Sequence, residues 1–275
     1  MAQHSLWKTP FAVALATALG AHAAVVREAT SCSGVPTHMV VTVEAHQGIS
    51  RPSVSRQDLI VYEGLDRVPV INWVALQGKS AGLELLLLID SDAPSELLSQ
   101  TNALNTFISK QPITTTIAVG HLRQNSVEIV HRFTTDHSLV AEAIHRLRDS
   151  TPSYDTPYAS LTDLIEHWSP SESRREILMI ANDKGLNNLN NSNIQSITAI
   201  AQQEGIIIYV VYASDEEITP YLDDIASKLR HQYELTFLAK CAAMPGFQPV
   251  RLQTESPDIR LTSADEVYVR VRPNR

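Results

Sequence analysis

Two aspartates follow the most apolar segment of the chain, and they are the first candidates for chemistry. Residues 83–89 carry one charge among leucines and an isoleucine, and Asp90 and Asp92 come directly after them. A carboxylate just before a helix accepts hydrogen bonds from free backbone N–H groups and meets the positive end of the helix dipole. A nucleophilic aspartate for phosphoryl transfer is the other chemistry for this position, but the lysine and threonine motifs of such sites do not accompany it. Helix capping is therefore our first interpretation of both residues.

Other signatures of catalysis are not identified. We find neither a nucleophile elbow nor a glycine-rich phosphate loop after a predicted strand. The ten histidines lack the H-E-x-x-H spacing of a zinc site. The sequence therefore predicts no enzymatic activity. We interpret six histidines as surface or loop residues: His121, His131, His137, His145, His167 and His231.

The charge balance and composition exclude several classes of protein. The 275 residues include 30 Asp and Glu against 22 Lys and Arg, which gives a formal charge of −8. A nucleic-acid binder needs a basic surface to displace phosphate counterions, so we expect no nucleic-acid partner. Two cysteines are too few for a disulfide-dense scaffold or a four-thiolate zinc site. An apolar content of 44% argues against a disordered chain.

Residues 1–23 are typical of a secretory signal peptide. Lys8 precedes an apolar run at 11–19, and Ala21-His22-Ala23 provides small residues at the positions that a signal peptidase recognises. A buried N-terminal helix is the alternative. The run is too short to cross about 30 Å of hydrocarbon, and no other segment is long and apolar enough. We therefore expect a secreted or periplasmic protein without a membrane span.

Export changes the interpretation of the two cysteines. In an oxidising compartment Cys32 and Cys241 can form a disulfide that ties the mature N-terminus to the C-terminal region. Two free thiols are the alternative.

From residue 83 onward, buried strands alternate with amphipathic helices. The connection at 120–126 is too short for a crossover helix and predicts a hairpin. The order β-α-β-β-α-α-β-α-β-α-β is typical of a doubly wound α/β fold. We expect a mostly parallel six-stranded sheet with one antiparallel edge strand and helices on both faces. The six predicted strands lie at 83–89, 114–119, 127–130, 177–181, 206–211 and 233–237.

Helix boundaries are marked by three residues. Asp136 is placed to cap a helix, Gly205 to end one and Pro220 to begin one. The apolar stripe expected after Asp136 consists of Leu139, Ala143, Ile144 and Leu147.

Short β runs flank the α/β region on both sides. The predicted organisation is a signal peptide at 1–23, an N-terminal β extension at 24–80, an α/β domain at 81–240 and a C-terminal β extension at 241–275. Because strands occur at both ends, we expect the two extensions to pack together.

The element order with its early hairpin resembles the von Willebrand factor A (VWA) domain. Four segments carry the resemblance: 86–92, 160–165, 174–183 and 205–211. The flanks resemble those of the secreted acidobacterial-type VWFA-related family. Membership of this group implies the VWA or Rossmann-like α/β fold and a role in protein binding or adhesion.

The resemblance also implies a divalent-cation site at the carboxyl ends of the strands, a metal-ion-dependent adhesion site (MIDAS). The family takes its ligands from an Asp-x-Ser-x-Ser loop and from a later Thr and Asp. Here Asp90 matches the first Asp, whereas Asp92 and Pro94 stand at the two Ser positions, Ala159 at the Thr position and Asn182 at the late Asp position. The site is thus degenerate, and we expect no cofactor.

An ion in altered geometry is the alternative. Its ligands would be Asp90, Asp92 and Asp183, with Ser95 and Thr156 as weaker candidates. Mg²⁺ or Ca²⁺ would be the ion, and Ca²⁺ is the more tolerant of irregular coordination.

Three functions remain. The first is a secreted, non-enzymatic module that binds a protein partner, without a standard metal site. The second is a metal-dependent ligand-binding or hydrolase-type site at Asp90, Asp92 and Asp183. The third is a structural component of an extracytoplasmic assembly. Trp168, with Tyr154 and Tyr158, can form a contact surface near the strand ends, and ordinary packing explains these rings equally well.

Overall fold

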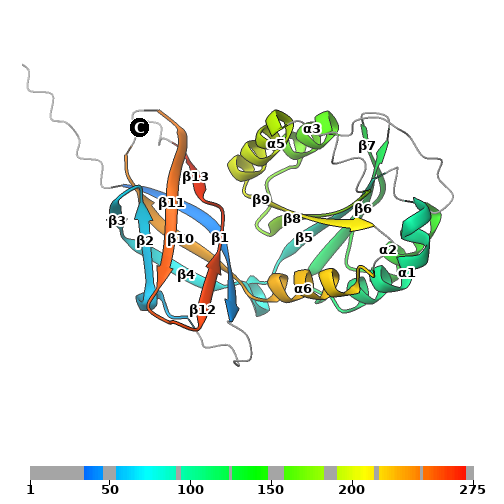
Figure 1. Cartoon of the computed structure of the whole chain (residues 1–275), viewed down its shortest axis with the longest axis horizontal. Helices are drawn as coiled ribbons and strands as arrows, with labels where there is room; N and C mark the ends of the chain where they lie inside the picture. The colour runs from blue at the N-terminus through cyan, green and yellow to red at the C-terminus, as the bar shows by residue number, and fades with distance from the viewer. Residues whose placement is uncertain are drawn as a thin grey trace, which may run out of the picture. The chain divides into compact units, whose positions relative to one another are not determined.

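The computed structural model describes residues 34–45, 54–90, 94–123, 126–147, 158–182, 191–213, 217–241 and 244–270. These residues form an α/β sheet with its helices and two antiparallel sheets made of strands from both ends of the chain (Figure 1).

The α/β sheet has five strands in the order β7-β6-β5-β8-β9. Strands β5, β6, β8 and β9 run parallel, and β7 is antiparallel to β6. The predicted hairpin and antiparallel edge strand are therefore confirmed. The strand bounds are Leu83–Asp90 for β5, Thr115–Arg123 for β6, Ser126–Thr134 for β7, Arg174–Asn182 for β8 and Ile206–Ala213 for β9.

Helices cover both faces of this sheet, as predicted. One face carries three described helices: α1 (Pro94–Ser109), α2 (His137–Leu147) and α6 (Thr219–Arg230). The other carries two, α3 (Tyr158–His167) and α5 (Asn191–Glu204) (Figure 1).

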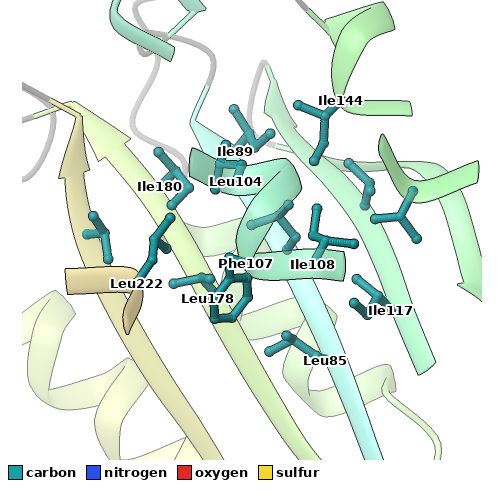
Figure 2. Close-up of a cluster of buried hydrophobic side chains, with 14 of the residues drawn as sticks. Leu85, Ile89, Leu104, Phe107, Ile108, Ile117, Ile144, Leu178, Ile180 and Leu222 are labelled. Atoms are coloured by element: carbon teal, nitrogen blue, oxygen red, sulfur yellow. The ribbon is translucent and has the colours of Figure 1, made fainter. Parts of the chain in front are cut away.

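The central strand explains the long apolar run in the sequence. Alternate residues of β5 enter different cores, with Leu85 and Ile89 on the α1 side and Leu86 and Leu88 on the α3 side. All four are at most 1% exposed. Figure 2 shows Leu85 and Ile89 among the side chains of α1, which lie over the sheet. A strand buried on both faces needs apolar residues at every position, and this one has them.

The three predicted helix-boundary residues are confirmed, and one residue of the predicted apolar stripe was wrong. Asp136 Oδ1 accepts a hydrogen bond from the backbone N–H of Ser138 at 3.1 Å, just before α2. Gly205 has φ of 66° directly after α5, and Pro220 lies in the first turn of α6. The predicted stripe of α2 was wrong at Leu139, which is 39% exposed. Val140 takes its place in the core.

The sixth strand of the predicted sheet was wrong. Strand β10 (Gln232–Ala239) pairs with β1 and β4 in a separate antiparallel sheet. Its sequence gives the reason, because the fully buried Leu235 and Phe237 alternate with the polar residues Glu234 and Thr236. Such alternation fits a sheet with one buried face, whereas a strand of a parallel sheet is apolar on both sides.

The antiparallel sheets form a β-sandwich. Their orders are β12-β1-β10-β4 and β13-β11-β2-β3. The core between them takes Val41 and Phe237 from the first sheet, and Val61 and Val250 from the second. Strands from before and after the α/β region are thus interleaved, as expected. The remaining bounds are β1 (Val35–Ala45), β2 (Leu59–Glu63), β3 (Asp66–Val68), β4 (Val70–Ala75), β11 (Gly246–Thr254), β12 (Ile259–Thr262) and β13 (Glu266–Val269), with short 3₁₀ turns η1 (Arg56–Asp58) and η2 (Gly78–Ser80).

Within the described residues, no helix is long and apolar enough to cross a membrane.

Candidate functional site

The strand-end edge, where the sequence predicts ligands, is described only at Asp90. This residue ends β5, is 3% exposed and pairs across the sheet with Leu122. Asp92, Asp183 and Thr156 lie outside the described residues, and so does the side chain of Ser95 in α1.

The two interpretations of Asp90 and Asp92, as helix caps or as ligands of an ion, both stay predictions. Helix α1 begins at Pro94, and residues 91–93 between it and Asp90 are not described. Across the described ranges, no three His, Cys, Asp or Glu side chains come together to hold a metal. We therefore derive no metal chemistry, and the ion site stays a prediction.

One of the two cysteines of the predicted disulfide lies within the described residues. Cys241 is disulfide-bonded. Cys32 lies outside the described residues, so its pairing with Cys241 stays a prediction.

The sequence contains one G-x-S-x-G spacing, but it does not form a nucleophile elbow. Residues 78–82 have the G-x-S-x-G spacing, but the segment forms η2 and lies between strands β4 and β5. A nucleophile elbow joins a strand to a helix, so the structural context is missing. Ser80 shares a pocket of about 400 Å³ with His38 and Glu234, whose Nδ1 and Oε1 are 2.9 Å apart. Among the described residues, His38 Nδ1 contacts Glu234 and Thr236 but not Ser80, and the His38 side chain is 60% exposed.

Two other expectations about single residues were wrong. His121 is not a surface residue, because it is 2% exposed within β6. Trp168 does not lie near the carboxyl ends of the strands, because it contacts Glu84 at the start of β5. Tyr154 and the side chain of Tyr158 lie outside the described residues.

Trp168 instead marks a groove of about 730 Å³ between helix α3 and edge strand β7, which we call the α3–β7 groove. Its floor includes Leu86 of β5 and Val127, Ile129 and Phe133 of β7. Ile129 is 43% exposed and Phe133 is 40% exposed. The groove therefore presents apolar side chains of a sheet face to solvent.

The pairing of β7 with β6 shows why these side chains face α3. Val127 pairs with Leu122, and Ile129 pairs with Gly120. Opposed residues of an antiparallel pair point to the same face, and Leu122 packs in the core beneath α3. Val127 and Ile129 thus lie on the α3 side of the sheet.

A helix contacts β7 on each face, and on the groove face Ile129 and Phe133 stay partly exposed. On the opposite face, helix α2 places Val140, Ala143 and Ile144 in the core, and Val130 of β7 packs against that core. On the groove face, α3 contributes Leu161 and Ile165 to the core and also contacts β7. In the part of the chain that the structure describes, no helix beyond α3 continues over β7.

The wall of the groove is polar and acidic. Asp163 and His167 are one turn apart on α3, with Oδ1 and Nδ1 3.2 Å apart and side chains about three-quarters exposed. A hydrogen bond of the ring with the backbone oxygen of Asp163 raises the pKa of His167, and the carboxylate of Asp163 raises it further. Leu164 lies between them and is half-buried.

The end of the groove is fixed by a hydrogen bond and a ring contact. Trp168 Nε1 donates to Oε2 of Glu84 at 3.0 Å. The Trp168 ring lies 5.4 Å from that of Phe133, with the planes tilted by 31°. These contacts hold a large ring in one position without a ligand.

A buried ion pair lies at the start of β8, away from the groove. Arg174 donates from Nε to Oε1 of Glu176 at 3.1 Å and from Nη2 to the backbone oxygen of Leu229 at 3.0 Å. Glu176 is fully buried, and burial raises its pKa to about 6 against the opposing effect of Arg174. Burial and the charge of Glu176 also raise the pKa of Tyr209. Because Arg174 ties β8 to the end of α6, we interpret this pair as structural.

The apolar alternation of β7 is the sequence signal for the groove, and our predicted strand included only its first half. The predicted strand ended at 130, whereas β7 continues to Thr134. Val127, Ile129 and Phe133 at odd positions mark one apolar face. An apolar face on an edge strand indicates that something packs on it, but not what.

Comparisons with known proteins give several similar solved structures and no family. No model of a known protein family matches the sequence, and no curated protein does. Among solved structures, the chain is similar to proximal thread matrix protein 1 from the mussel byssus, with 12% identity and a TM-score of 0.42 over 56% of this chain and 46% of the other. It is also similar to the vWF domain of the type V pili tip protein Mfa5 from Porphyromonas gingivalis, with 15% identity and a TM-score of 0.31 over 37% and 38%. The SpRpn10 VWA domain has 12% identity and a TM-score of 0.35 over 51% of this chain and 94% of its own.

VWA domains are thus among the similar structures. This chain spans less than half the length of the first two of them. At these identities and TM-scores, the similarity carries no inference about activity, metal or partner.

Proposed function

We propose that this chain is a protein-interaction module that binds a protein partner in the α3–β7 groove. The observation that carries the proposal is the open apolar floor, where Ile129 and Phe133 are each at least 40% exposed beside a fixed Trp168 ring. Contiguous exposed apolar side chains with a polar rim are typical of protein contact sites.

The chemistry of the groove supports binding rather than catalysis. Its titratable residues already have partners, because Asp163 binds His167 and Glu84 binds Trp168. The first pair is exposed, whereas catalytic electrostatics need a site that excludes water. We therefore propose a non-enzymatic role.

We further propose that the protein acts outside the cytoplasm. The support is the N-terminal segment, with Lys8, the apolar run at 11–19 and Ala21-His22-Ala23. The groove does not include Asp90, so we propose that partner binding needs no divalent ion.

The test compares partner capture by the full chain with and without an intact floor. The immobilised protein is incubated with the extracytoplasmic fraction of its own source, and bound proteins are quantified by mass spectrometry. The floor variant is Ile129→Asn. Its matched control is Ile113→Asn, because Ile113 is 81% exposed and lies outside the groove.

We expect a protein that is retained by the wild type and by Ile113→Asn, with or without EDTA, and lost from Ile129→Asn. Circular dichroism confirms that both variants fold. The same bound proteins on both variants, or no bound protein on any, would contradict the proposal.

A further inference from the structure

Strand β9 forms one edge of the α/β sheet, at the opposite edge from β7 and the α3–β7 groove (Figure 1). Among the described strands it pairs with β8 alone. The predicted sixth strand, β10, lies in another sheet and does not continue this one. We propose that the outer edge of β9 binds an extended, apolar segment of a protein partner as a sixth strand. This surface is separate from the groove, so the inference goes beyond the proposed function.

The two edge strands differ in the features that prevent pairing with another chain. Charged side chains and irregular pairing protect an edge. Strand β7 has both, with Glu128 and Arg132 and with two register shifts in its pairing with β6. Strand β9, Ile206–Ala213, contains no charged residue and no proline, and its eight pairs with β8 keep a regular register. A long, regular and uncharged edge is the form that accepts a further strand.

The exposed side chains of β9 lie on one face of the strand. Ile206 and Ile208 pack on the α5 side, so by alternation Val210 and Tyr212 point to the same side. Ile206 is 5% exposed, whereas Val210 is 41% and Tyr212 is 46% exposed. Residues directly opposite them on an added strand would lie about 5 Å away and would cover them. The occupant therefore needs apolar residues at every second position.

A cavity of about 320 Å³ follows the first half of this edge. It touches Ile206, which packs on the α5 side, and Tyr209, which packs on the α6 side. A cavity that touches side chains from both faces of a strand runs along its edge. Met39 and Val40 of β1, which belong to the same compact unit at 32–275, also line it. The space beside β9 is therefore open to a chain that is one strand thick.

The alternative occupant is the β9 strand of a second copy. Antiparallel pairing about Val210 would set Ile208 against Tyr212, which is an apolar match. Strand β1 lines the same cavity, however, and a second copy would bring its own β1 and helices into that space. The formal charge of −8 on each copy also opposes association. A single extended segment meets neither obstacle, so we favour a segment of a partner.

The experiment selects peptides from a phage-displayed library of random 12-residue sequences on the immobilised full chain. Selection is repeated on Val210→Lys, which places a charge on the exposed face of β9. Tyr212→Lys repeats the test at a second exposed position. Ile71→Lys is the matched control, because Ile71 is 40% exposed on another edge strand, β4. Circular dichroism confirms that the variants fold.

Dissociation constants of the enriched peptides are then measured on the wild type, on these variants and on Ile129→Asn. Each synthetic peptide is also made with single N-methylated backbone amides. Methylation removes one hydrogen-bond donor at a time, so it reports which amides of the peptide pair with the protein.

We expect enriched peptides in which β-branched or aromatic residues alternate with polar ones. Their dissociation constants should rise at least about tenfold for Val210→Lys and stay unchanged for Ile71→Lys and Ile129→Asn. N-methylation should weaken binding about fivefold to tenfold at every second amide of the paired segment and have little effect between them. The reason is that successive amides of a strand point to opposite edges.

Other outcomes would overturn the inference. Peptides that need Val210 but show no period of two in the N-methyl series would overturn the strand occupant. Equal binding to the wild type and Val210→Lys, or a library that yields no binder, would overturn the site itself. A wild-type dimer in sedimentation that Val210→Lys converts to a monomer would identify a second copy instead of a partner. The proposed function is tested separately at Ile129, so either proposal can fail alone.

Discussion

Trp168 and Glu84 are joined by a hydrogen bond of 3.0 Å from the indole N–H to Oε2. They are 84 positions apart in the sequence, and the bond attaches the end of α3 to the start of β5. It also sets the indole ring against Phe133. A ring that is already fixed loses little freedom when a partner packs on it, which favours binding. This bond is therefore one of the contacts that hold the Trp168 ring at the end of the groove.

Trp168→Phe tests that dependence. The variant keeps an aromatic ring but loses the N–H, which leaves Glu84 without this donor. We expect the free energy of unfolding to fall by about 1 kcal/mol, measured by urea denaturation. Partner affinity should fall as well. Trp73→Phe is the control, because it also loses an indole hydrogen bond, to Val54, but lies in the sandwich. Equal partner affinity in both variants would show that the bond does not shape the groove.

Much of the sheet could be predicted because buried parallel strands have a clear signal. Strand β5 is apolar at positions on both faces, and the short connection after β6 predicted the hairpin. Strand β10 was misassigned because order along the chain does not say which sheet a strand joins. Its alternation of Leu235 and Phe237 with Glu234 and Thr236 was the available evidence.

The free energy of unfolding should depend on pH through the protonation of Glu176. Burial raises the pKa of this carboxyl to about 6 from an ordinary 4.5, so the folded state binds more protons between these values. Its contribution is fully present below pH 4.5 and is lost as the pH rises through 6, which corresponds to on the order of 2 kcal/mol.

Glu176→Gln is the matching variant, because the amide still accepts the hydrogen bond of Arg174. We expect its free energy of unfolding to depend less on pH between 4.5 and 7 than that of the wild type, in urea titrations at several pH values. Parallel curves for the two proteins would contradict the assignment.

Binding of a basic partner should weaken at acid pH because of His167. Its pKa is raised above the ordinary 6.5 by Asp163, first through the backbone oxygen and then through the carboxylate. As the pH falls through this pKa, a positive charge forms on the rim and repels basic groups of the partner. Both side chains are about three-quarters exposed, so solvent screening limits the effect to roughly twofold in affinity. His167→Gln should remove it, and an unchanged pH profile in that variant would refute the explanation.

Disulfide mapping should find Cys32 linked to Cys241. The chain has two cysteines, and Cys241 is disulfide-bonded. Peptide mass mapping without reductant should recover one cross-linked pair from monomeric protein. Recovery of Cys241 linked to a second chain, or free, would exclude the intramolecular bridge.

The candidate site was harder to predict than the fold. The sequence directed attention to Asp90 and Asp92, because a polar pair after a buried strand is conspicuous. The groove instead depends on how far α3 leaves Ile129 and Phe133 of β7 exposed. Strand periodicity shows which residues share a face, but cover by a helix is a tertiary property that no local pattern encodes.

The most direct test of the account is the partner's dissociation constant for Ile129→Asn relative to Ile113→Asn. Both changes replace an exposed isoleucine with the same polar residue, but only Ile129 lies in the groove. The account predicts binding at least about tenfold weaker for Ile129→Asn and unchanged for Ile113→Asn. Equal dissociation constants for the two variants would contradict it.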